Sequence, residues 1–352
     1  MKSSYSDNDV TLLLKDITGL VEPLPASVRE VYIQSGTHYC EMLPLEYTPT
    51  EMYMNAYQQA LVNYSAATAA AIANLAEKIY RKKGGNTVIV SLARAGIPIG
   101  ILLKRYLRFQ YQVDVPHYAI SIIRGRGIDK NAINYILAHH DPDSVQFIDG
   151  WIGKGAILGQ LKEALRDYPQ LSPALGVVSD PAMLTDLCGT HSDLLIPSSC
   201  LNATVTGLIS RTFLRDDIIG ADDFHGAAFY QELAPHDLSE DFLSAVQQYF
   251  APPNPESECG FSGRTGLDVV RQIAAHYNVR DINLIKPGIG EATRVLLRRI
   301  PWKMILNPDY AQADELRHIR QLADEKHVPC EISSVPLGNY KVCGIIKQLT
   351  DV

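Results

Sequence analysis

The fold of this 352-residue chain is decided by the stretch Ser144-Val145-Gln146-Phe147-Ile148-Asp149-Gly150-Trp151-Ile152-Gly153-Lys154-Gly155-Ala156-Ile157. Its beginning, residues 145–148, is a short apolar run that predicts a buried strand, and from Ala156 onward apolar residues recur at helical spacing. The loop between them has Asp149, three glycines and Lys154. Glycines let the backbone approach a ligand closely, and amides at a helix N-terminus favour an anion. The stretch predicts a phosphate site; the alternative is an ordinary strand–helix turn with a surface lysine.

A second unit of the same kind lies earlier in the chain. Residues 87–90 predict another buried strand, and Ser91-Leu92-Ala93-Arg94-Ala95-Gly96 connects it to a helix from Ile97. Arg94 lies at the carboxyl end of its strand, where open α/β sheets bind ligands, and a guanidinium matches phosphate oxygens. We therefore predict that Arg94 contacts a diphosphate, with an uninvolved surface arginine as the alternative.

Two more arginines follow a third predicted strand, residues 116–123. Arg124 and Arg126 alternate with glycines, which indicates a cationic loop that either closes over an anionic substrate or is a solvated turn. Taken with strands expected at 174–179 and 194–196 and a long helix over 49–83, the pattern predicts an α/β protein with a doubly wound parallel sheet.

Composition is typical of an ordinary globular protein, with 46% hydrophobic and 20% charged residues. The N-terminus lacks the pattern of a signal peptide, and no uncharged apolar run reaches the length of a membrane span. The six cysteines form no C-x-x-C pair, so neither a zinc site nor a disulfide framework is expected. We therefore expect a reduced, cytoplasmic protein that does not interact with membranes.

The run Ala251-Pro252-Pro253-Asn254-Pro255 indicates a linker. We therefore expect a first domain over residues 1–250, a linker over 251–263, and a second, smaller α/β domain over 264–352. Basic residues outnumber acidic ones in the second domain, although the whole chain has a net charge of -7, which favours a polyanion as its partner. The apolar spacing near the end predicts a final helix over 337–348.

A set of polar residues follows the later strands of the first domain and predicts an acceptor pocket, with tight packing or turns as the alternative. These residues are Asp180, Ser199, Cys200, Asn202, Asp223 and His225. Cys200 also lies near a predicted helix N-terminus, which favours its thiolate. It is therefore a candidate nucleophile, with His191, Asp193 or His225 as companions, or else a residue of the core.

Two of these loops resemble those of the type I phosphoribosyltransferases. Residues 88–96 resemble the family's pyrophosphate loop, with Arg94 and Gly96 matching and Ala95 in place of a glycine. Residues 147–156 resemble the motif that holds phosphoribosyl pyrophosphate. Asp149 matches its first acid, whereas Gly150 and Gly153 stand where the family has further carboxylates.

Three longer runs, residues 147–155, 196–205 and 286–294, resemble the StiP-type proteins of bacterial tellurium-resistance and stress operons, and the resemblance covers about residues 30–350. It implies a phosphoribosyltransferase-like domain joined to a pelota-like RNA-binding domain, and some relatives carry a cysteine protease label. In the pelota-like domain the implied RNA contacts are Lys286, Gly288, Gly290, Glu291, Arg294 and Arg298.

The main expectation from the resemblance is a transfer of phosphoribose from phosphoribosyl pyrophosphate to an unknown nitrogen acceptor. The expected catalytic residues are Asp149, which would hold the ribose and, through water, Mg²⁺, and Arg94, which would hold the pyrophosphate. Arg124 is the third, and it or Arg126 would close over the pyrophosphate. The other expected phosphate contacts are Ala95, Gly96, Gly150, Trp151, Gly153, Lys154, Gly155 and Arg126.

Two other functions stay open at this point. The missing carboxylates favour a non-catalytic sensor of a phosphoribosyl ligand or related sugar phosphate, coupled to RNA binding. A cysteine protease or other hydrolase that uses Cys200 is the second alternative. The oligomeric state is also open, with a homodimer among the expectations.

Overall fold

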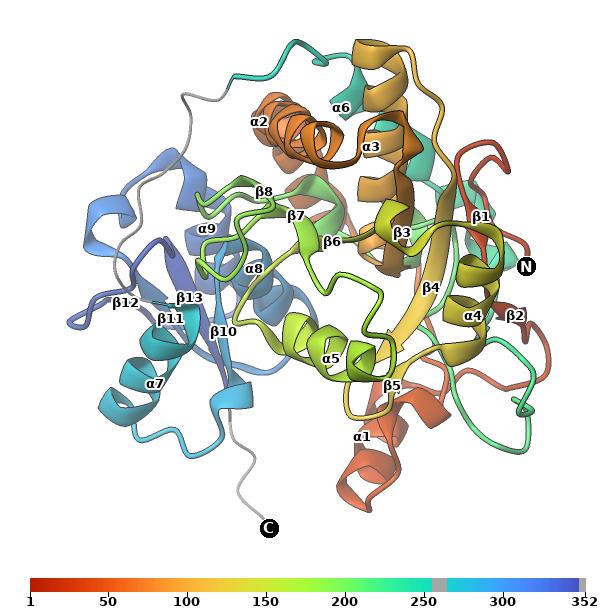
Figure 1. The fold of residues 1–352 in the computed structure, drawn as a ribbon. Helices are drawn as coiled ribbons and strands as arrows, with labels where there is room; N and C mark the ends of the chain where they lie inside the picture. The colour runs from red at the N-terminus through yellow and green to blue at the C-terminus, as the bar shows by residue number, and fades with distance from the viewer. Residues whose placement is uncertain (255–264, 348–352) are drawn as a thin grey trace.

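The structure is a computed structural model that describes residues 1–254 and 265–347. Within these residues it is a mixed α/β protein with a seven-stranded central sheet, a four-stranded C-terminal sheet and a small pair, β2 (Lys15–Asp16) with β9 (Gly226–Ala227). Figure 1 shows the C-terminal sheet beside the first unit, across from the N-terminus. No helix of the described residues combines the length and the apolar character of a membrane span.

The central sheet has the order β1-β4-β3-β6-β7-β8, and these strands are parallel. The short strand β5 pairs antiparallel with β4. The order from β4 to β8 is that of a doubly wound sheet, whose direction of winding reverses between β3 and β6. The strands are β1 (Thr11–Leu12), β3 (Val88–Ala93), β4 (His117–Ile123), β5 (Gly127–Ile128), β6 (Val145–Trp151), β7 (Leu175–Ser179) and β8 (Cys188–Thr190).

Helices cover both faces of this sheet because the central strands are apolar on both sides. Ile89 of β3 packs into the core formed with α2, α3 and α6, whereas Val88 and Val90 pack with α4 and α5 on the opposite face. The helices of the first unit are α1 (Ala26–Gln34), α2 (Glu51–Lys83), α3 (Gly96–Tyr111), α4 (Lys130–His139), α5 (Ala156–Ala164) and α6 (Ser239–Gln247).

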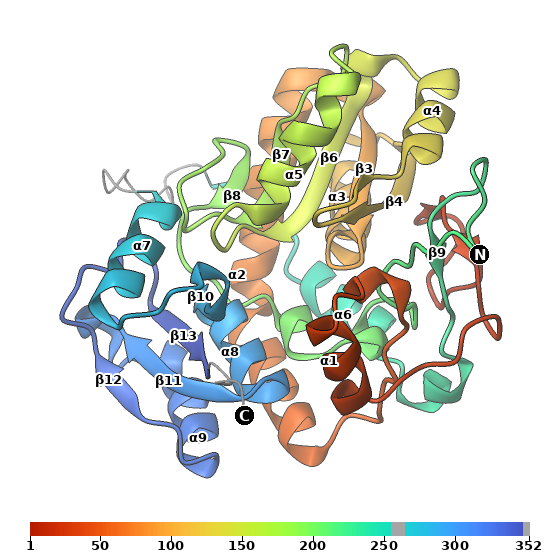
Figure 2. The same cartoon turned by 90° about the horizontal axis from the view of Figure 1, so that it is seen from below.

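The C-terminal unit is a four-stranded sheet of order β10-β13-β11-β12, in which β13 is antiparallel to both of its neighbours. Its helix α8 packs against η5 (Pro197–Cys200), a short 3₁₀ helix of the first unit, and Figure 2 shows α8 next to α2. Its elements are α7 (Gly266–His276), β10 (Ile285–Pro287), α8 (Ile289–Arg298), β11 (Pro301–Leu306), α9 (Arg317–Glu325), β12 (Cys330–Ile332) and β13 (Val342–Ile346).

The prediction of a parallel α/β sheet is confirmed, as is the long helix, which is α2. The predicted final helix is wrong, because residues 342–346 form the central strand of the C-terminal sheet. The predicted strand at 194–196 is also absent from the described residues, where an irregular segment leads into η5. Most of the predicted linker lies in residues 255–264, outside the described part, so the exact domain boundaries stay a prediction.

A substitution at Gly189 of β8 tests how the sheet packs on α2. A Cβ at this position would lie 2.1 Å from the backbone oxygen of Ala71, so a larger residue must push the strand off the helix. We expect Gly189→Ala to lower the free energy of unfolding by about 3 kcal/mol, measured by chemical denaturation. The matched control is Gly159→Ala in α5, where nothing lies within 4 Å of the added carbon, and a rise of about 0.5–1 kcal/mol is expected. Equal effects of the two substitutions would contradict this account of the interface.

Candidate active site

A pocket of about 300 Å³ lies at the carboxyl ends of β3 and β6, where the winding of the sheet reverses. Ligands of open α/β sheets bind at this position. The C-terminal unit closes the pocket with Lys286 of β10 and with Glu291 and Arg294 of α8. The phosphate loop and the RNA loop predicted from the sequence therefore line one and the same pocket.

Asp149 and Lys154 lie in this pocket in unusual electrostatic surroundings. Burial raises the pKa of Asp149 to about 7, and Oδ1 of Asp149 accepts a hydrogen bond from its neighbour's amide, that of Gly150, at 2.8 Å. Burial lowers the pKa of Lys154 to about 8, and Lys286 and Arg124 lower it further by repulsion. The Lys154 ammonium donates to the backbone oxygens of Ile282 and Ile285, the latter at 3.2 Å. Lys154 thus ties the first unit to the C-terminal one.

The three predicted phosphate-binding arginines differ in their contacts. Arg94 lines the pocket, but its guanidinium also contacts Glu46 at 3.3 Å and Oδ1 of Asn202 at 3.1 Å. Arg124 lines the pocket and donates to Asn283 at 2.8 Å. Arg126 is absent from the pocket lining and forms an exposed ion pair instead. Of the predicted loop residues, the lining includes Ala95, Trp151, Gly153 and Gly155, but neither Gly96 nor Gly150.

The predicted Mg²⁺ was tested against the groups available to hold it. Mg²⁺ is bound through carboxylates together with phosphates of a substrate. Asp149 is one carboxyl, and its raised pKa opposes the ionised form that a cation needs. No group of three or more acidic, histidine or cysteine side chains suited to a metal is present in the described residues. Mg²⁺ at Asp149 therefore stays a prediction, and the reaction proposed for the chain does not involve it.

The six predicted acceptor residues are not gathered into one pocket. Asp223 pairs with Lys15, and His225 contacts the Ser121 hydroxyl at 2.8 Å. Cys200 is buried in the core, with its sulfur 4.0 Å from the backbone oxygen of Ala56. Ser199 lies next to Gly290 of the C-terminal unit, and Asn202 contacts Arg94. Among the described residues, Asp180 alone of the six lies beside both a cysteine and a histidine, Cys188 and His191.

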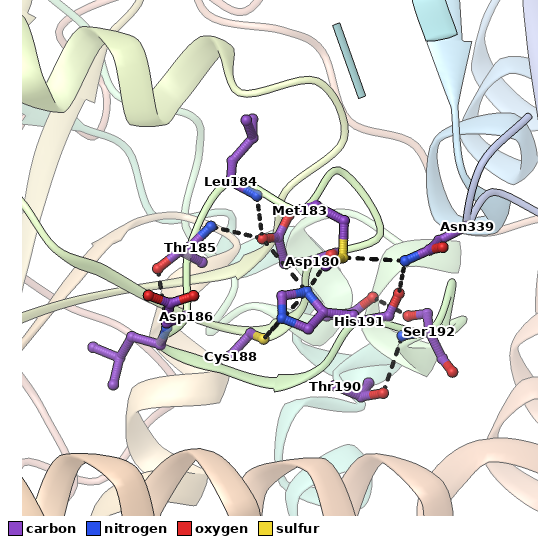
Figure 3. A network of polar contacts seen from close by, with 12 residues as sticks. Asp180, Met183, Leu184, Thr185, Asp186, Cys188, Thr190, His191, Ser192 and Asn339 are labelled. Carbon is purple, nitrogen blue, oxygen red and sulfur yellow. Dashed lines mark hydrogen bonds and ion pairs between the residues drawn. The ribbon is translucent and has the colours of Figure 1, made fainter. Parts of the chain in front are cut away.

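Asp180 follows β7, Cys188 is the first residue of β8, and His191 follows β8; these three residues meet in one cluster (Figure 3). Nε2 of His191 lies 3.4 Å from the sulfur of Cys188, and Nδ1 lies 2.9 Å from the backbone oxygen of Asp180. The Asp180 carboxylate is 3.8 Å from Nδ1 and accepts the amides of Leu184 and Thr185 at 2.7 and 2.8 Å. The imidazole thus lies between a thiol and an acidic residue.

The hydrogen bonds of this cluster select the state of the imidazole. Nδ1 lies at hydrogen-bond distance from a carbonyl, which can only accept, so Nδ1 has the proton and Nε2 is the acceptor toward the thiol. Burial raises the pKa of Asp180, and its Oδ1 has no hydrogen-bond partner in the described residues. A buried polar atom of this kind is uncommon in a purely structural site. The arrangement suits a thiol that transfers its proton to a histidine oriented by an acid.

Comparison with known proteins supports the same chemistry. Residues 3–247 match the family described as "Tellurite-like stress resistance cysteine protease StiP", and residues 264–348 match the PELOTA RNA-binding domain. A protein of Acinetobacter baylyi named cysteine protease StiP is 33% identical over 365 residues, which cover 98% of this chain and 94% of that protein.

The chain belongs to the StiP family.

Membership of the StiP family corrects the main functional expectation. Phosphoribosyl transfer is wrong as the activity, because the family and the relative are named as cysteine proteases, which are hydrolases. The assignment as a glycosyltransferase that binds phosphoribosyl pyrophosphate is withdrawn with it. The structure is consistent with this correction, since burial raises the pKa of Asp149 and Arg94 is already held by Glu46. Of the functions left open by the sequence, the naming supports the cysteine hydrolase.

The other cysteines of this StiP-family chain have less suitable surroundings. Cys40 lies 2.9 Å from Nδ1 of His38, but burial raises the pKa of its thiol to about 11. Burial also raises the pKa of Cys343, to about 12. Cys200 as nucleophile stays a prediction; its sulfur lies 4.0 Å from the backbone oxygen of Ala56. The geometry therefore favours Cys188 over these residues.

Sequence reasoning missed Cys188 and treated His191 only as a companion of Cys200. A usable signal was present, because Asp180 follows a predicted strand, and Cys188 and His191 lie shortly after it in the sequence. Side chains at the carboxyl ends of neighbouring parallel strands lie close together. The strand β8 has only three residues, which is too short for its apolar pattern to be recognised.

The raised pKa of Asp149 gives a test that does not depend on activity. Its pKa of about 7 in the folded chain exceeds the value of 3.8 for a free carboxyl, so its contribution to stability is complete below pH 4 and is lost as pH rises through 7. Asp149→Asn removes this loss. Relative to wild type, the variant should gain about 4 kcal/mol in the free energy of unfolding between pH 4 and pH 8. Denaturation at several pH values measures this difference, with Asp216→Asn at an exposed position as control. Parallel pH profiles for Asp149→Asn and wild type would contradict the raised pKa.

Proposed function

We propose that this chain is a cysteine hydrolase that cleaves an amide bond, with Cys188 as nucleophile, His191 as general base and Asp180 as the group that orients His191. The observation behind the proposal is the position of the His191 imidazole between the thiol and the acid, with its nitrogens 3.4 Å from the sulfur and 2.9 Å from the Asp180 carbonyl. The protease name of the family supports the same chemistry.

The proposed reaction proceeds in two balanced steps. The thiol of Cys188 gives its proton to Nε2 of His191 as the sulfur attacks the substrate carbonyl carbon, and the resulting imidazolium then gives that proton to the departing amine. The carbon–nitrogen bond breaks and a thioester remains. Water, deprotonated by the same imidazole, cleaves the thioester and restores the thiol. The Asp180 carboxylate, 3.8 Å from Nδ1, stabilises the imidazolium while it exists.

Access to the thiol requires a movement of the chain. Cys188 is fully buried, whereas 14% of the His191 side chain is exposed. The segment 181–187 joins Asp180 to Cys188, and its Ala182 backbone oxygen accepts a hydrogen bond from Gly266 of the C-terminal unit at 2.9 Å. Asn339 of that unit also contacts the backbone oxygen of His191 at 3.4 Å. A substrate reaches the sulfur once this segment or the C-terminal unit shifts.

We further propose that the C-terminal domain binds RNA through the loop between β10 and α8. The match of residues 264–348 to the PELOTA RNA-binding domain supports this role. Lys286 and Arg294, two of the predicted contacts, lie on β10 and α8, on either side of this loop. The side chain of Arg298, a third, lies outside the described part. In this proposal, one chain combines nucleic-acid binding with hydrolysis.

We retain a type I phosphoribosyltransferase-like fold for the first domain as a proposal about architecture alone. Its support is the doubly wound strand order, and a pocket at the point where the winding reverses. A fold does not determine an activity, and a scaffold of this kind can have a different site at another pair of strand ends. The predicted domain limits and a homodimeric state stay predictions.

Substitution of the proposed catalytic residues tests the function directly. We expect Cys188→Ala and His191→Gln each to reduce the rate of peptide hydrolysis by about 10³-fold or more, because the nucleophile and its base act as one unit. Asp180→Asn keeps the carbonyl contact to Nδ1 and should cause a smaller loss. The measurement is mass-spectrometric analysis of a peptide library incubated with each full-length protein.

The matched controls are Cys40→Ala and Cys200→Ala, which remove other buried thiols and should leave the rate close to that of wild type. Circular dichroism establishes that all variants are folded. Hydrolysis that persists in Cys188→Ala and disappears in Cys200→Ala would move the nucleophile to Cys200. A wild-type chain that cleaves no peptide bond would refute the proposed function.

A further inference from the structure

The backbone of the RNA loop is not accessible in this structure. Gly288, Ile289 and Gly290 are all buried against the first unit. The Asp193 carboxylate accepts the Ile289 amide at 2.9 and 3.0 Å, so an acidic side chain occupies the position where the N-terminus of α8 would attract a phosphate. A Cβ on Gly290 would lie 3.6 Å from the Ser199 hydroxyl. RNA therefore cannot reach this loop through its amides while the two units are docked.

The side chains of the same loop are accessible from a different direction. Lys286, Glu291 and Arg294 line the 300 Å³ pocket, and the opposite wall contains Arg124 and Lys154 of the first unit. An RNA phosphate that reaches the predicted contacts of the C-terminal domain thus also meets the cations of the first domain. The two predicted binding regions cannot bind separate ligands in this arrangement.

The charge of the pocket favours an anion. Five cationic side chains line it, against the carboxyls of Asp149 and Glu291. The cations repel one another. This repulsion, together with burial, lowers the pKa values of both Lys154 and Lys286. A bound phosphate would relieve this repulsion in a site of low dielectric constant, where each contact is stronger than in water. The cations are Arg94, Arg124, Lys154, Lys286 and Arg294.

The size of the pocket limits the ligand to a single nucleotide unit. A volume of about 300 Å³ is at the small end of ligand pockets and excludes a helical segment of nucleic acid. Single-stranded RNA can instead present an unstacked base and its phosphate, and aromatic side chains commonly stack on such bases. Trp151 supplies an aromatic ring in the lining, with the Arg294 guanidinium 5.6 Å from its centroid.

From these observations we propose that the pocket between the two domains binds one nucleotide of single-stranded RNA, and that Arg124 and Lys154 of the first domain contact it together with Lys286 and Arg294 of the second. The proposal rests on the RNA-binding role proposed above and specifies its site. The RNA surface is then composite, and the C-terminal domain alone is an incomplete binding site.

Fluorescence anisotropy with a labelled single-stranded RNA of about ten nucleotides tests the proposal on the full-length chain. We expect Arg124→Gln, Lys154→Gln and Arg294→Gln each to weaken binding about tenfold and to reduce the slope of log affinity against log salt by about one, as loss of a phosphate contact does. The matched controls are Arg166→Gln in the first domain and Arg317→Gln in the second, both exposed and outside the pocket lining. Unchanged melting temperatures exclude unfolding as the cause.

The possible results separate this proposal from the functions on which it depends. If Arg294→Gln weakens binding while Arg124→Gln and Lys154→Gln behave as the controls do, RNA binds the second domain alone and the composite site is refuted. If a nucleoside monophosphate does not displace the RNA from wild type, the single-nucleotide pocket is refuted. If wild type binds no RNA, the proposed RNA-binding role fails with it, whereas peptide hydrolysis is measured independently.

Discussion

A buried carboxylate joins the two units of this chain. Asp193 is 3% exposed, and its oxygens accept the amide of Ile289 at 2.9 and 3.0 Å and the amide of Lys341 at 2.9 Å. Burial raises the pKa of Asp193 to about 6. The amides and the N-terminus of α8 oppose this shift, so the carboxylate stays charged at neutral pH. Removing the hydrogen-bond partner of a buried charge or amide strongly destabilises the folded state. The contacts of Asp193 therefore make the docking of the C-terminal unit specific.

The position of Asp193 explains why the two candidate sites lie so close together. It follows His191 by two residues, so the contact that holds α8 also holds the segment with the proposed general base. The preceding segment, residues 181–187, packs closely on the phosphate loop, because a Cβ on Gly155 would lie 2.5 Å from the Leu184 side chain. The pocket at the ends of β3 and β6 and the cluster at the ends of β7 and β8 are therefore separated by one layer of packed loops.

The sequence was sufficient for the features that depend on local pattern. The apolar runs that became β3, β4, β6 and β7, and the long α2, were predicted because hydrophobic spacing determines them. The final strand β13 was predicted as a helix, since its apolar residues also suit helical spacing and its partners β10 and β11 are distant in sequence. Pairing of that kind is a tertiary effect that overrides propensity.

The residues of the candidate sites also differ in whether local pattern could predict them. Asp149 and Arg94 were placed at strand ends, and Lys154 in the following loop, from pattern alone. The contact of Cys188 with His191 instead depends on how a three-residue strand pairs with β7. The resemblance to phosphoribosyltransferase loops also directed attention to the ends of β3 and β6, away from the cluster of Asp180, Cys188 and His191 where the proposed catalytic groups lie. Fold-level likeness indicates where ligands can bind, but the chemistry depends on which side chains meet.

The central claim is that Cys188 is the reactive thiol, and the most direct measurement is the site of covalent modification by a peptide with an electrophilic end group. The full-length protein is treated at neutral pH, digested, and mapped by mass spectrometry. The account predicts an adduct on Cys188 that is lost in His191→Gln, because the imidazole generates the thiolate. An adduct on Cys200 or Cys40, with Cys188 unmodified in the folded protein, would contradict it.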